Sequence, residues 1–283
     1  MAQSSPSNVR RAKEALGSRL REIRKDSGMT ARALAAAAGW HESKTSRIEN
    51  GRTTPSDADI RVWTRLCRAE ERNADLVATA RGIEGMYVEW RRLERGGLKH
   101  VQESVRPLFE RTRRFHFYQS WVVPGLLQTP DYTRSVLSTV VALRGAPDDV
   151  DAAVAVRMER QRILHSGRQR FAMLIEEWVL RTVIGDPRVM AGQLDRLITV
   201  ASLPSVSLGV IPMGIERGNA WPTESFCVFD DEQVSVELVS ANLTVTQPCE
   251  VAEYTRTFQV LAGAAVYGAG ARNLITAAID ALG

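Results

Sequence analysis

The chain has 283 residues, 44% hydrophobic and 25% charged, which indicates a globular protein long enough for two domains. It has no apolar run of the roughly 20 residues that a membrane span needs and no signal-peptide pattern, so we expect a cytoplasmic protein. Its three cysteines and four histidines are scattered along the chain, so we expect no disulfide framework, metal site or cofactor. Residues 1–55 carry 11 Lys and Arg against 5 Asp and Glu, a balance of +6 in a chain of net charge +4.

The first residues are polar and rich in serine, so residues 1–8 are expected to form a disordered arm. A helix is predicted over residues 11–26, where apolar residues spaced i, i+4 and i+7 share one face: Leu16, Leu20 and Ile23. Gly28 follows this helix and is suited to the left-handed conformation that ends it.

Three further helices are predicted in this segment. Thr30 is the expected N-cap of the second helix, which ends after two turns at Gly39. The third begins near residues 40–42 and is stopped by Asn50 and Gly51, and a fourth opens at residues 55–56. Two short helices joined by a tight glycine-containing turn, within a five-helix bundle, predict a helix-turn-helix, and the basic charge of this region suits nucleic-acid binding.

Residues 16–56 read LGSRLREIRKDSGMTARALAAAAGWHESKTSRIENGRTTPS. This string resembles the XRE-type family that includes phage repressors and Cro, because the turn glycine, the buried positions and the terminal Glu-Asn-Gly all keep the family's spacing. Residues 9–70 are therefore identified as an XRE-type helix-turn-helix domain. The resemblance implies a sequence-specific DNA-binding transcriptional regulator, located on the nucleoid when it is bound to DNA.

The resemblance also implies roles for individual positions. The third helix would lie in the major groove, which is about 12 Å wide, and its base-facing positions are Glu42, Ser43 and Arg47. Backbone and phosphate contacts are implied for a second set: Thr30, Ala31, Lys44, Asn50 and Arg52. Structural roles are implied for the buried ion pair Arg24–Glu49 and for the inward-pointing Thr45 and Ile48. The alternative for each exposed residue is a merely solvated side chain, and for Glu42 repulsion of a phosphate.

Residues 71–118 are predicted to be a helical connector. A helix continues from Glu71, the glycines at positions 96 and 97 interrupt it, and the linker to the next domain is expected at residues 95–100. A further helix is predicted over residues 101–118. Its basic run, Arg111, Arg113 and Arg114, has a nucleic-acid-binding interpretation, but a solvated helix face is favoured because the aromatic residues that follow are suited to packing.

Residues 119–283 are predicted to form an α+β domain, so that an all-α head precedes an α+β body and the chain is helix-rich overall. Alternation and β-branching predict strands within FAMLIEEW, VSLGVIP, SFCVF and QVSVELV. Helices are expected where a cap residue precedes a proline, at Thr129-Pro130 and Asp186-Pro187. Two more helices are expected in the last 36 residues.

Three strings of this region, VPGLLQTPDYTR, GDPRVMAGQLDRL and VSLGVIP, resemble the DUF5753 family of C-terminal domains that are commonly fused to XRE-type regulators. The resemblance covers residues 122–281 and implies a Scr1-type antitoxin-like regulator whose partner is a small DUF397-type protein. What the domain binds does not follow from it. Pro124, Gly125, Gln128 and Tyr132 are candidates to line a site, although a fold-defining turn is the favoured interpretation.

No constellation of catalytic residues stands out, so we do not expect an enzyme. Glu176 and Glu177 are adjacent and would diverge on a strand or a helix, and Gly268 and Gly270 lack the preceding strand and third glycine of a dinucleotide loop.

Three functions remain open. The first is a DNA-binding regulator, expected as a homodimer, that a small protein partner controls, and the second is such a regulator controlled by a small-molecule effector. The third is a protein-interaction scaffold with a vestigial DNA-binding head.

Overall fold

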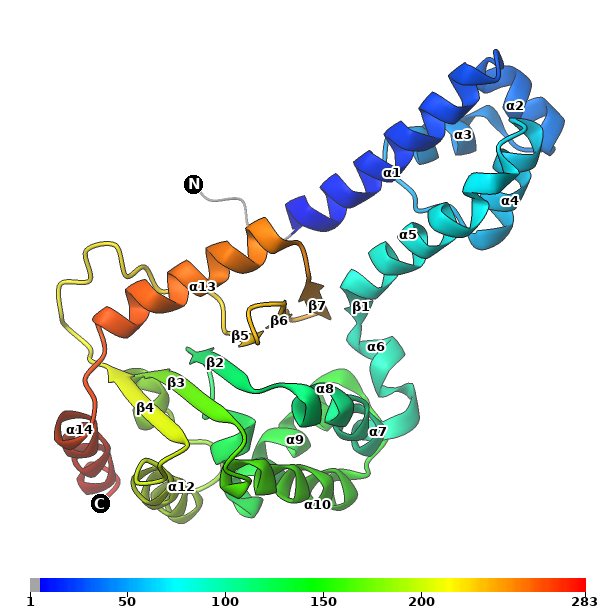
Figure 1. The fold of residues 1–283 in the computed structure, drawn as a ribbon. Coiled ribbons are helices and arrows are strands. Elements are labelled where there is room, and N and C mark those ends of the chain that lie inside the picture. The colour runs from blue at the N-terminus through cyan, green and yellow to red at the C-terminus, as the bar shows by residue number, and fades with distance from the viewer. Residues whose placement is uncertain (1–5) are drawn as a thin grey trace. The chain divides into compact units, whose positions relative to one another are not determined.

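The computed structural model describes residues 6–283, which form two compact units (Figure 1). The first unit ends at Val88 and the second comprises Glu89–Gly283. This division lies before the glycine pair at positions 96 and 97, which was expected to mark the linker, because those residues continue a helical segment of the second unit. In the described part of the chain, no helix is long and apolar enough to cross a membrane.

The first unit is a bundle of helices, as the apolar spacing predicts. Its elements are α1 (Pro6–Asp26), α2 (Ala31–Ala38), α3 (Glu42–Glu49), α4 (Asp57–Leu66), a 3₁₀ turn (Glu70–Arg72) and α5 (Asn73–Met86). Helix α1 starts earlier than predicted, so residues 6–8 of the expected disordered arm are helical, and the rest of that arm lies outside the described residues.

The helices of this unit surround one apolar core. Leu16, Leu20 and Ile23 of α1 are buried there together with residues of every other helix, among them Trp63, whose indole N–H donates to the carbonyl of Leu20 at 3.1 Å. Gly17 lies where α1 crosses the end of α3. A Cβ on Gly17 would stand 2.5 Å from the carbonyl oxygen of Ile48. The two backbones therefore approach closely, and only glycine fits the crossing.

The second unit combines a mixed sheet with helices. Its strands are β2 (Arg114–Gln119), β3 (Arg170–Glu176), β4 (Val206–Ile211), β5 (Phe226–Phe229), β6 (Gln233–Glu237) and β7 (Ala241–Val245), and β1 (Tyr87–Glu89) spans the boundary between the units. Its α-helices are α6 (Trp90–Leu93), α7 (Gly97–Ser104), α8 (Arg106–Arg111), α9 (Pro130–Arg144), α10 (Val150–Arg160), α11 (Glu177–Arg181), α12 (Pro187–Val200), α13 (Pro248–Gly263) and α14 (Ala269–Asp280). Short 3₁₀ turns lie at Glu94–Gly96, Gly125–Leu127 and Gln161–His165.

The sheet has the strand order β1-β7-β6-β5-β2-β3-β4. Strands β2, β3 and β4 are parallel, whereas β5, β6 and β7 are joined to β2 and to one another in antiparallel fashion. Helix α13 covers one face, where Phe258 stacks on His116 of β2 with ring centroids 4.8 Å apart. The other helices of the unit lie on the opposite face (Figure 1). The fold is therefore α+β, as expected.

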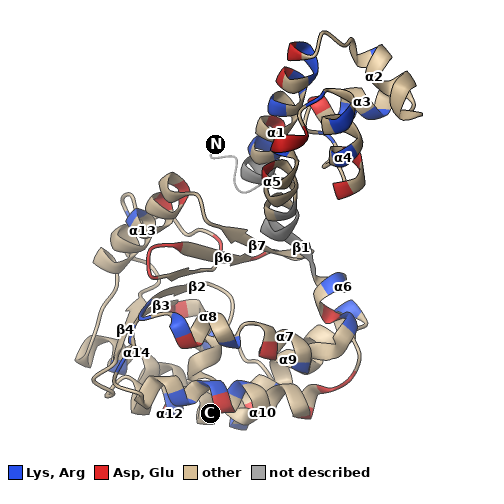
Figure 2. Ribbon diagram, turned by 45° about the vertical axis from the view of Figure 1, so that its right-hand side comes forward, with Lys and Arg blue, Asp and Glu red and all other residues tan. Residues whose placement is uncertain are grey.

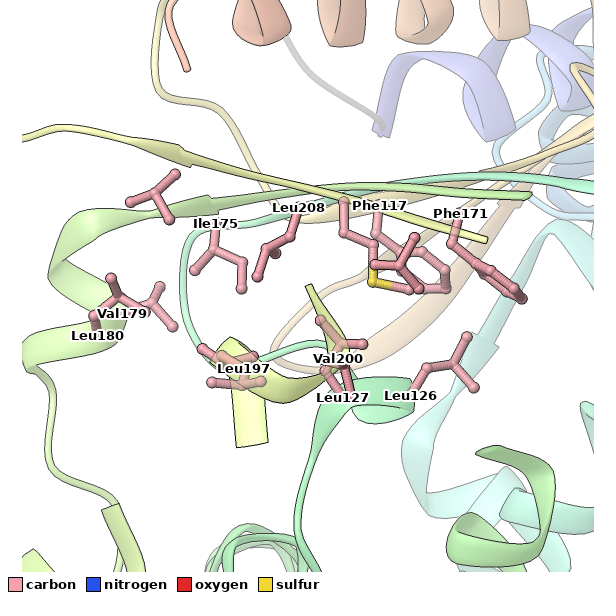
Figure 3. Packing of buried hydrophobic residues seen from close by; sticks show 14 of the residues in the cluster. Phe117, Leu126, Leu127, Phe171, Ile175, Val179, Leu180, Leu197, Val200 and Leu208 are labelled. Atoms are coloured by element: carbon pink, nitrogen blue, oxygen red, sulfur yellow. The ribbon is translucent and has the colours of Figure 1, made fainter. Parts of the chain in front are cut away.

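The main core lies between the parallel strands and the helices of that opposite face. Figure 3 shows Phe117, Phe171 and Ile175 of the sheet above Leu197 and Val200 of α12. The capped starts expected from the sequence are present, because the side chains of Thr129 and Asp186 accept hydrogen bonds from the first turns of α9 and α12. The two helices expected in the last 36 residues are α13 and α14.

The helix predicted over residues 101–118 is wrong in its second half. Helix α8 ends at Arg111, and Phe115, Phe117 and Tyr118 belong to β2, the central strand that pairs with β3 and β5. The basic run is therefore not a helix face. Arg114 begins the strand, where its guanidinium pairs with Asp231 at 3.0 Å. Alternation of aromatic residues on a strand and helical spacing cannot be distinguished over so short a segment, and pairing with distant strands decides the outcome.

Replacing Gly17 by alanine is expected to destabilise the first unit by about 1–3 kcal/mol, because the new methyl group would push α1 away from the backbone of α3. Hydrogen exchange of peptides from α1 to α4 in the full chain measures the loss. Gly82→Ala is the matched control, since a Cβ at this exposed position of α5 meets no atom within 4 Å, and it is expected to stabilise its helix by roughly 0.5–1 kcal/mol. Equal protection in both variants would contradict the close crossing.

Candidate DNA-binding site

Helices α2 and α3 form the two-helix element that the sequence predicts between Thr30 and Asn50. Thr30 caps α2, because its hydroxyl accepts from the backbone N–H of Ala33 at 3.0 Å. Gly39 ends α2 in the left-handed conformation, with φ of 69°, and the chain turns directly into α3. His41 caps α3, its imidazole Nδ1 accepting from the N–H of Ser43. The tight turn and both caps are therefore encoded locally.

A buried ion pair attaches the end of α3 to α1. The Arg24 guanidinium donates to both carboxylate oxygens of Glu49, at 2.5 and 3.1 Å, and both side chains are less than a tenth exposed. Arg24 also donates to the carbonyl of Met29 at 2.6 Å, and Arg21 reaches Glu49 from the solvent side at 3.2 Å. The structural pair implied for Arg24 and Glu49 is confirmed. A bidentate pair of this kind fixes the direction of the helix that carries it.

The faces of α3 differ in burial. Thr45 and Ile48 point into the bundle and are almost completely buried, as expected. Ser43 and Arg47 lie exposed, one helical turn apart, and Arg47 donates only to the carbonyl of Ser43 at 3.3 Å. A hydrogen bond of this length to a backbone oxygen is easily exchanged, so the guanidinium of Arg47 remains available to a ligand.

Two of the charged residues among the predicted contacts already form ion pairs within the unit. Glu42 is exposed and pairs with Arg32 of α2 at 3.0 Å. Lys44 is half-buried, lies over the Trp40 ring and donates to Asp59 at 2.6 Å. Burial alone would raise the pKa of Asp59, but the hydrogen bonds from Lys44 and from Ser56 lower it below its ordinary value. The ammonium of Lys44 is thus neutralised locally, which weakens its assignment to a phosphate.

The remaining predicted residues lie at the ends of the two helices. Asn50 ends α3, donates to the carbonyl of Ser46 at 2.8 Å and accepts from Arg21 at 2.7 Å. Arg52 is exposed just beyond it. Ala31 is the first residue of α2, where backbone N–H groups point outward from the helix end. Arg21, which orients Asn50, was not among the sequence candidates, because its partner is 29 positions away.

Acidic residues are interspersed with the basic ones in this unit, as Figure 2 shows on α1. Several basic side chains consequently form ion pairs within the unit, among them Arg24, Arg32 and Lys44. Among the described residues of the two-helix element and the turn after it, Arg47 and Arg52 are exposed basic residues that form no ion pair within the unit, and the backbone start of α2 is a third anion-binding feature.

The second unit shows no comparable site at the positions named from the sequence. Gln128 and Tyr132 are buried in the turn before α9, where the Gln128 amide donates to the carbonyl of Val123 at 2.8 Å and burial raises the pKa of Tyr132 to about 12. The favoured interpretation, a fold-defining turn, fits these contacts. Glu176 and Glu177 are both buried and each pairs with an arginine, Arg217 and Arg181 respectively.

Residues 6–283 contain no group of three or more His, Cys, Asp or Glu side chains that could hold a metal ion. The three cysteines are unpaired: Cys67 and Cys227 are buried, where burial raises the pKa of each thiol, and Cys249 is exposed.

Comparison with known proteins identifies two segments. Residues 108–277 match a family model described as a domain of unknown function, DUF5753, and residues 15–77 match one described as a helix-turn-helix domain. No curated protein matches the chain. Among solved structures, that of TrmBL2, an archaeal chromatin protein with a novel mode of DNA binding, aligns over 85% of this chain and 88% of that one at 14% identity. Its TM-score of 0.33 does not establish a shared fold.

Glu49→Ala is expected to destabilise the first unit by about 3–5 kcal/mol, because it leaves the Arg24 guanidinium buried without a counter-charge. Pulse proteolysis in urea, read from cleavage within α1 to α4, measures this change. Glu42→Ala removes the same charge from the same helix, but its pair with Arg32 is exposed, so little change in stability is expected. If the two variants unfold at the same urea concentration, the buried pair does not hold α3.

Proposed function

The chain belongs to the DUF5753 family and begins with a helix-turn-helix domain, and we propose that it is a sequence-specific DNA-binding transcriptional regulator of the XRE type, which acts by binding and not by catalysis. The observation that carries the proposal is the position of Arg47: it is exposed on α3, while the buried Thr45, Ile48 and Glu49 anchor the other side of the helix. A helix anchored in this way presents a fixed set of side chains to a groove.

Arg47 and Ser43 are proposed to read base edges in the major groove. An arginine fork makes a bidentate contact with the O6 and N7 acceptors of guanine, and a serine hydroxyl accepts or donates to several bases. Arg52, Asn50 and the backbone N–H groups at the start of α2 are proposed to hold phosphates on either side, which fixes the register of the helix on the duplex. For Glu42 to read cytosine, its exposed pair with Arg32 would have to open.

A homodimer is proposed because one short helix with a few phosphate contacts supplies little specific affinity at physiological salt. Two heads bound to half-sites one helical turn apart, about 34 Å, would double the contacts. We propose that the second unit supplies the dimer contacts or the regulatory input. Control by a small DUF397-type protein partner is the regulation that we favour, because the resemblance of this unit to Scr1-type antitoxin-like regulators implies such a partner.

Arg47→Ala is expected to weaken binding to the specific DNA site by roughly 1–3 kcal/mol, about 5- to 150-fold, while binding to unrelated duplex changes little. Fluorescence anisotropy with DNA from upstream of the protein's own gene, measured over a range of salt concentrations, tests this. Arg65→Ala removes an equal charge from an exposed position of α4 and should leave the specificity ratio unchanged.

If Arg47→Ala and Arg65→Ala both bind the specific DNA site as tightly as the wild type, α3 does not read the sequence. If the folded wild type binds no specific site with or without a partner, the head is vestigial and the chain is a protein-interaction scaffold.

Addition of the purified DUF397-type partner is expected to form a stable complex with the full chain and to change its affinity for the specific DNA site at least several-fold. Size-exclusion chromatography of the mixture and anisotropy titrations with increasing partner measure the two effects. Complex formation with unchanged DNA affinity would contradict regulation through this partner, and control by a small-molecule effector would then be the proposal to test.

A further inference from the structure

Two arginines lie side by side at the end of α10 in the second unit. Arg157 and Arg160 are three positions apart and partly buried, and both guanidinium groups donate to the same amide oxygen, Oε1 of Gln102, at 3.1 and 3.0 Å. Arg157 also donates to Oε1 of Gln128 at 2.7 Å, and Arg160 lies over the Phe109 ring. Two positive charges are thus brought together through one neutral acceptor.

Neither arginine forms an ion pair with a carboxylate whose side chain the structure describes. Their acceptors are amide and backbone carbonyl oxygens, whereas the neighbouring Arg106 pairs with Glu159 at 2.9 Å. Burial lowers the pKa of Arg157 to about 10, and burial together with the charge of Arg157 lowers that of Arg160 to about 9. Charged groups removed from water are ordinarily compensated by an opposite charge, as Arg24 is by Glu49, and this pair is not compensated by a described carboxylate.

The pair keeps hydrogen-bond donors without a described acceptor. Nε of Arg160 is buried and has no partner. The hydrogen bonds of Arg157 to described residues leave from Nε and Nη1, and none leaves from Nη2. The neighbouring Gln161 amide is oriented by its own donations, from Nε2 to the carbonyls of Gly125 and Gln128. Arginine forks with vacant donors bind the oxygen atoms of phosphates and carboxylates.

The sheet presents a polar face on the same side as α10. Along β6, Val234 and Val236 are buried, while Gln233, Ser235 and Glu237 alternate with them and remain partly or fully exposed. The antiparallel register carries this polar face onto β7, where Ser235 is opposite Thr244 and Glu237 is opposite Asn242. Ser235 is also opposite Cys227, which belongs to the core on the helix side of the sheet. Figure 1 shows β5 to β7 between α13 and the helices α7 to α10.

Glu237 connects this face to the arginines. Its carboxylate raises the pKa of Arg157 without forming an ion pair with it among the described contacts. The sheet face is therefore apolar above α12 and polar along β6 and β7. We propose that Arg157 and Arg160, with the polar face of β6 and β7, bind a small molecule that carries a phosphate or carboxylate group. Glu237 and Asn242 suit hydroxyl or amino groups elsewhere on the same molecule.

Calorimetric titration and thermal unfolding of the full chain test this site, with pyrophosphate, inorganic phosphate and citrate as probes and sodium chloride at matched ionic strength as the blank. At least one probe is expected to bind the wild type and to raise its unfolding temperature by a few degrees. Arg157→Gln and Arg160→Gln should each weaken that binding at least 10-fold. Arg134→Gln is the matched control, because its guanidinium is exposed and pairs with Asp131 and Asp151.

The DNA-binding head is the other place where a phosphate could bind, so Arg47→Ala is included and should leave the response unchanged. A response to phosphate and pyrophosphate alone would assign the site to phosphorylated ligands, and a response to citrate alone to carboxylates. Circular dichroism confirms that the variants are folded, and Arg157→Lys, which retains the charge, should keep part of the affinity. Binding that is equal in wild type and Arg157→Gln, that is abolished by Arg47→Ala, or that is absent for all three probes overturns the proposal.

Discussion

The presentation of α3 depends on one interaction, the buried ion pair between Arg24 and Glu49. An isolated helix of eight residues is not stable in water, so α3 must be held by tertiary contacts. The pair ties its last residue to α1, and the close approach that Gly17 permits sets the depth at which the helix lies. Because both charges are buried, neither partner can be lost without leaving the other uncompensated. Stability of the head and orientation of its exposed Arg47 therefore have the same origin.

The sequence predicts the head well because its determinants are local. Caps such as Thr30, the glycine at position 39 and the apolar spacing of α1 each act within a few residues, and the structure reproduces them. The second unit is less predictable because its sheet is built from distant segments. Strand β7 was not predicted, and residues 114–118 were assigned to a helix, although they belong to β2, the strand between β3 and β5. Pairing partners more than 50 positions away decide such cases, and no local pattern contains them.

The candidate site shows the same division between local and distant determinants. The positions of Ser43 and Arg47 on the exposed side of α3 follow from helical spacing, and the structure agrees. The ion pair between Lys44 and Asp59 does not follow from helical spacing, because Asp59 is on another helix and the half-buried position of Lys44 depends on how the helices pack. Residue type and register thus identify which side chains face outward, but the electrostatic neighbours that leave a charge free or neutralise it have to be read from the fold.

Arg24 in the head and the pair Arg157 and Arg160 in the second unit are held in different ways. In the head, Arg24 is compensated by a carboxylate at 2.5 Å, as is expected of a group whose role is structural. In the second unit, Arg157 and Arg160 share an amide oxygen and retain vacant donors. A glutamate in place of Gln102 would offset one of the two positive charges, as Glu49 does for Arg24 in the head. An amide holds the guanidinium groups in place without cancelling their charge, which is the arrangement that a site for an external anion requires.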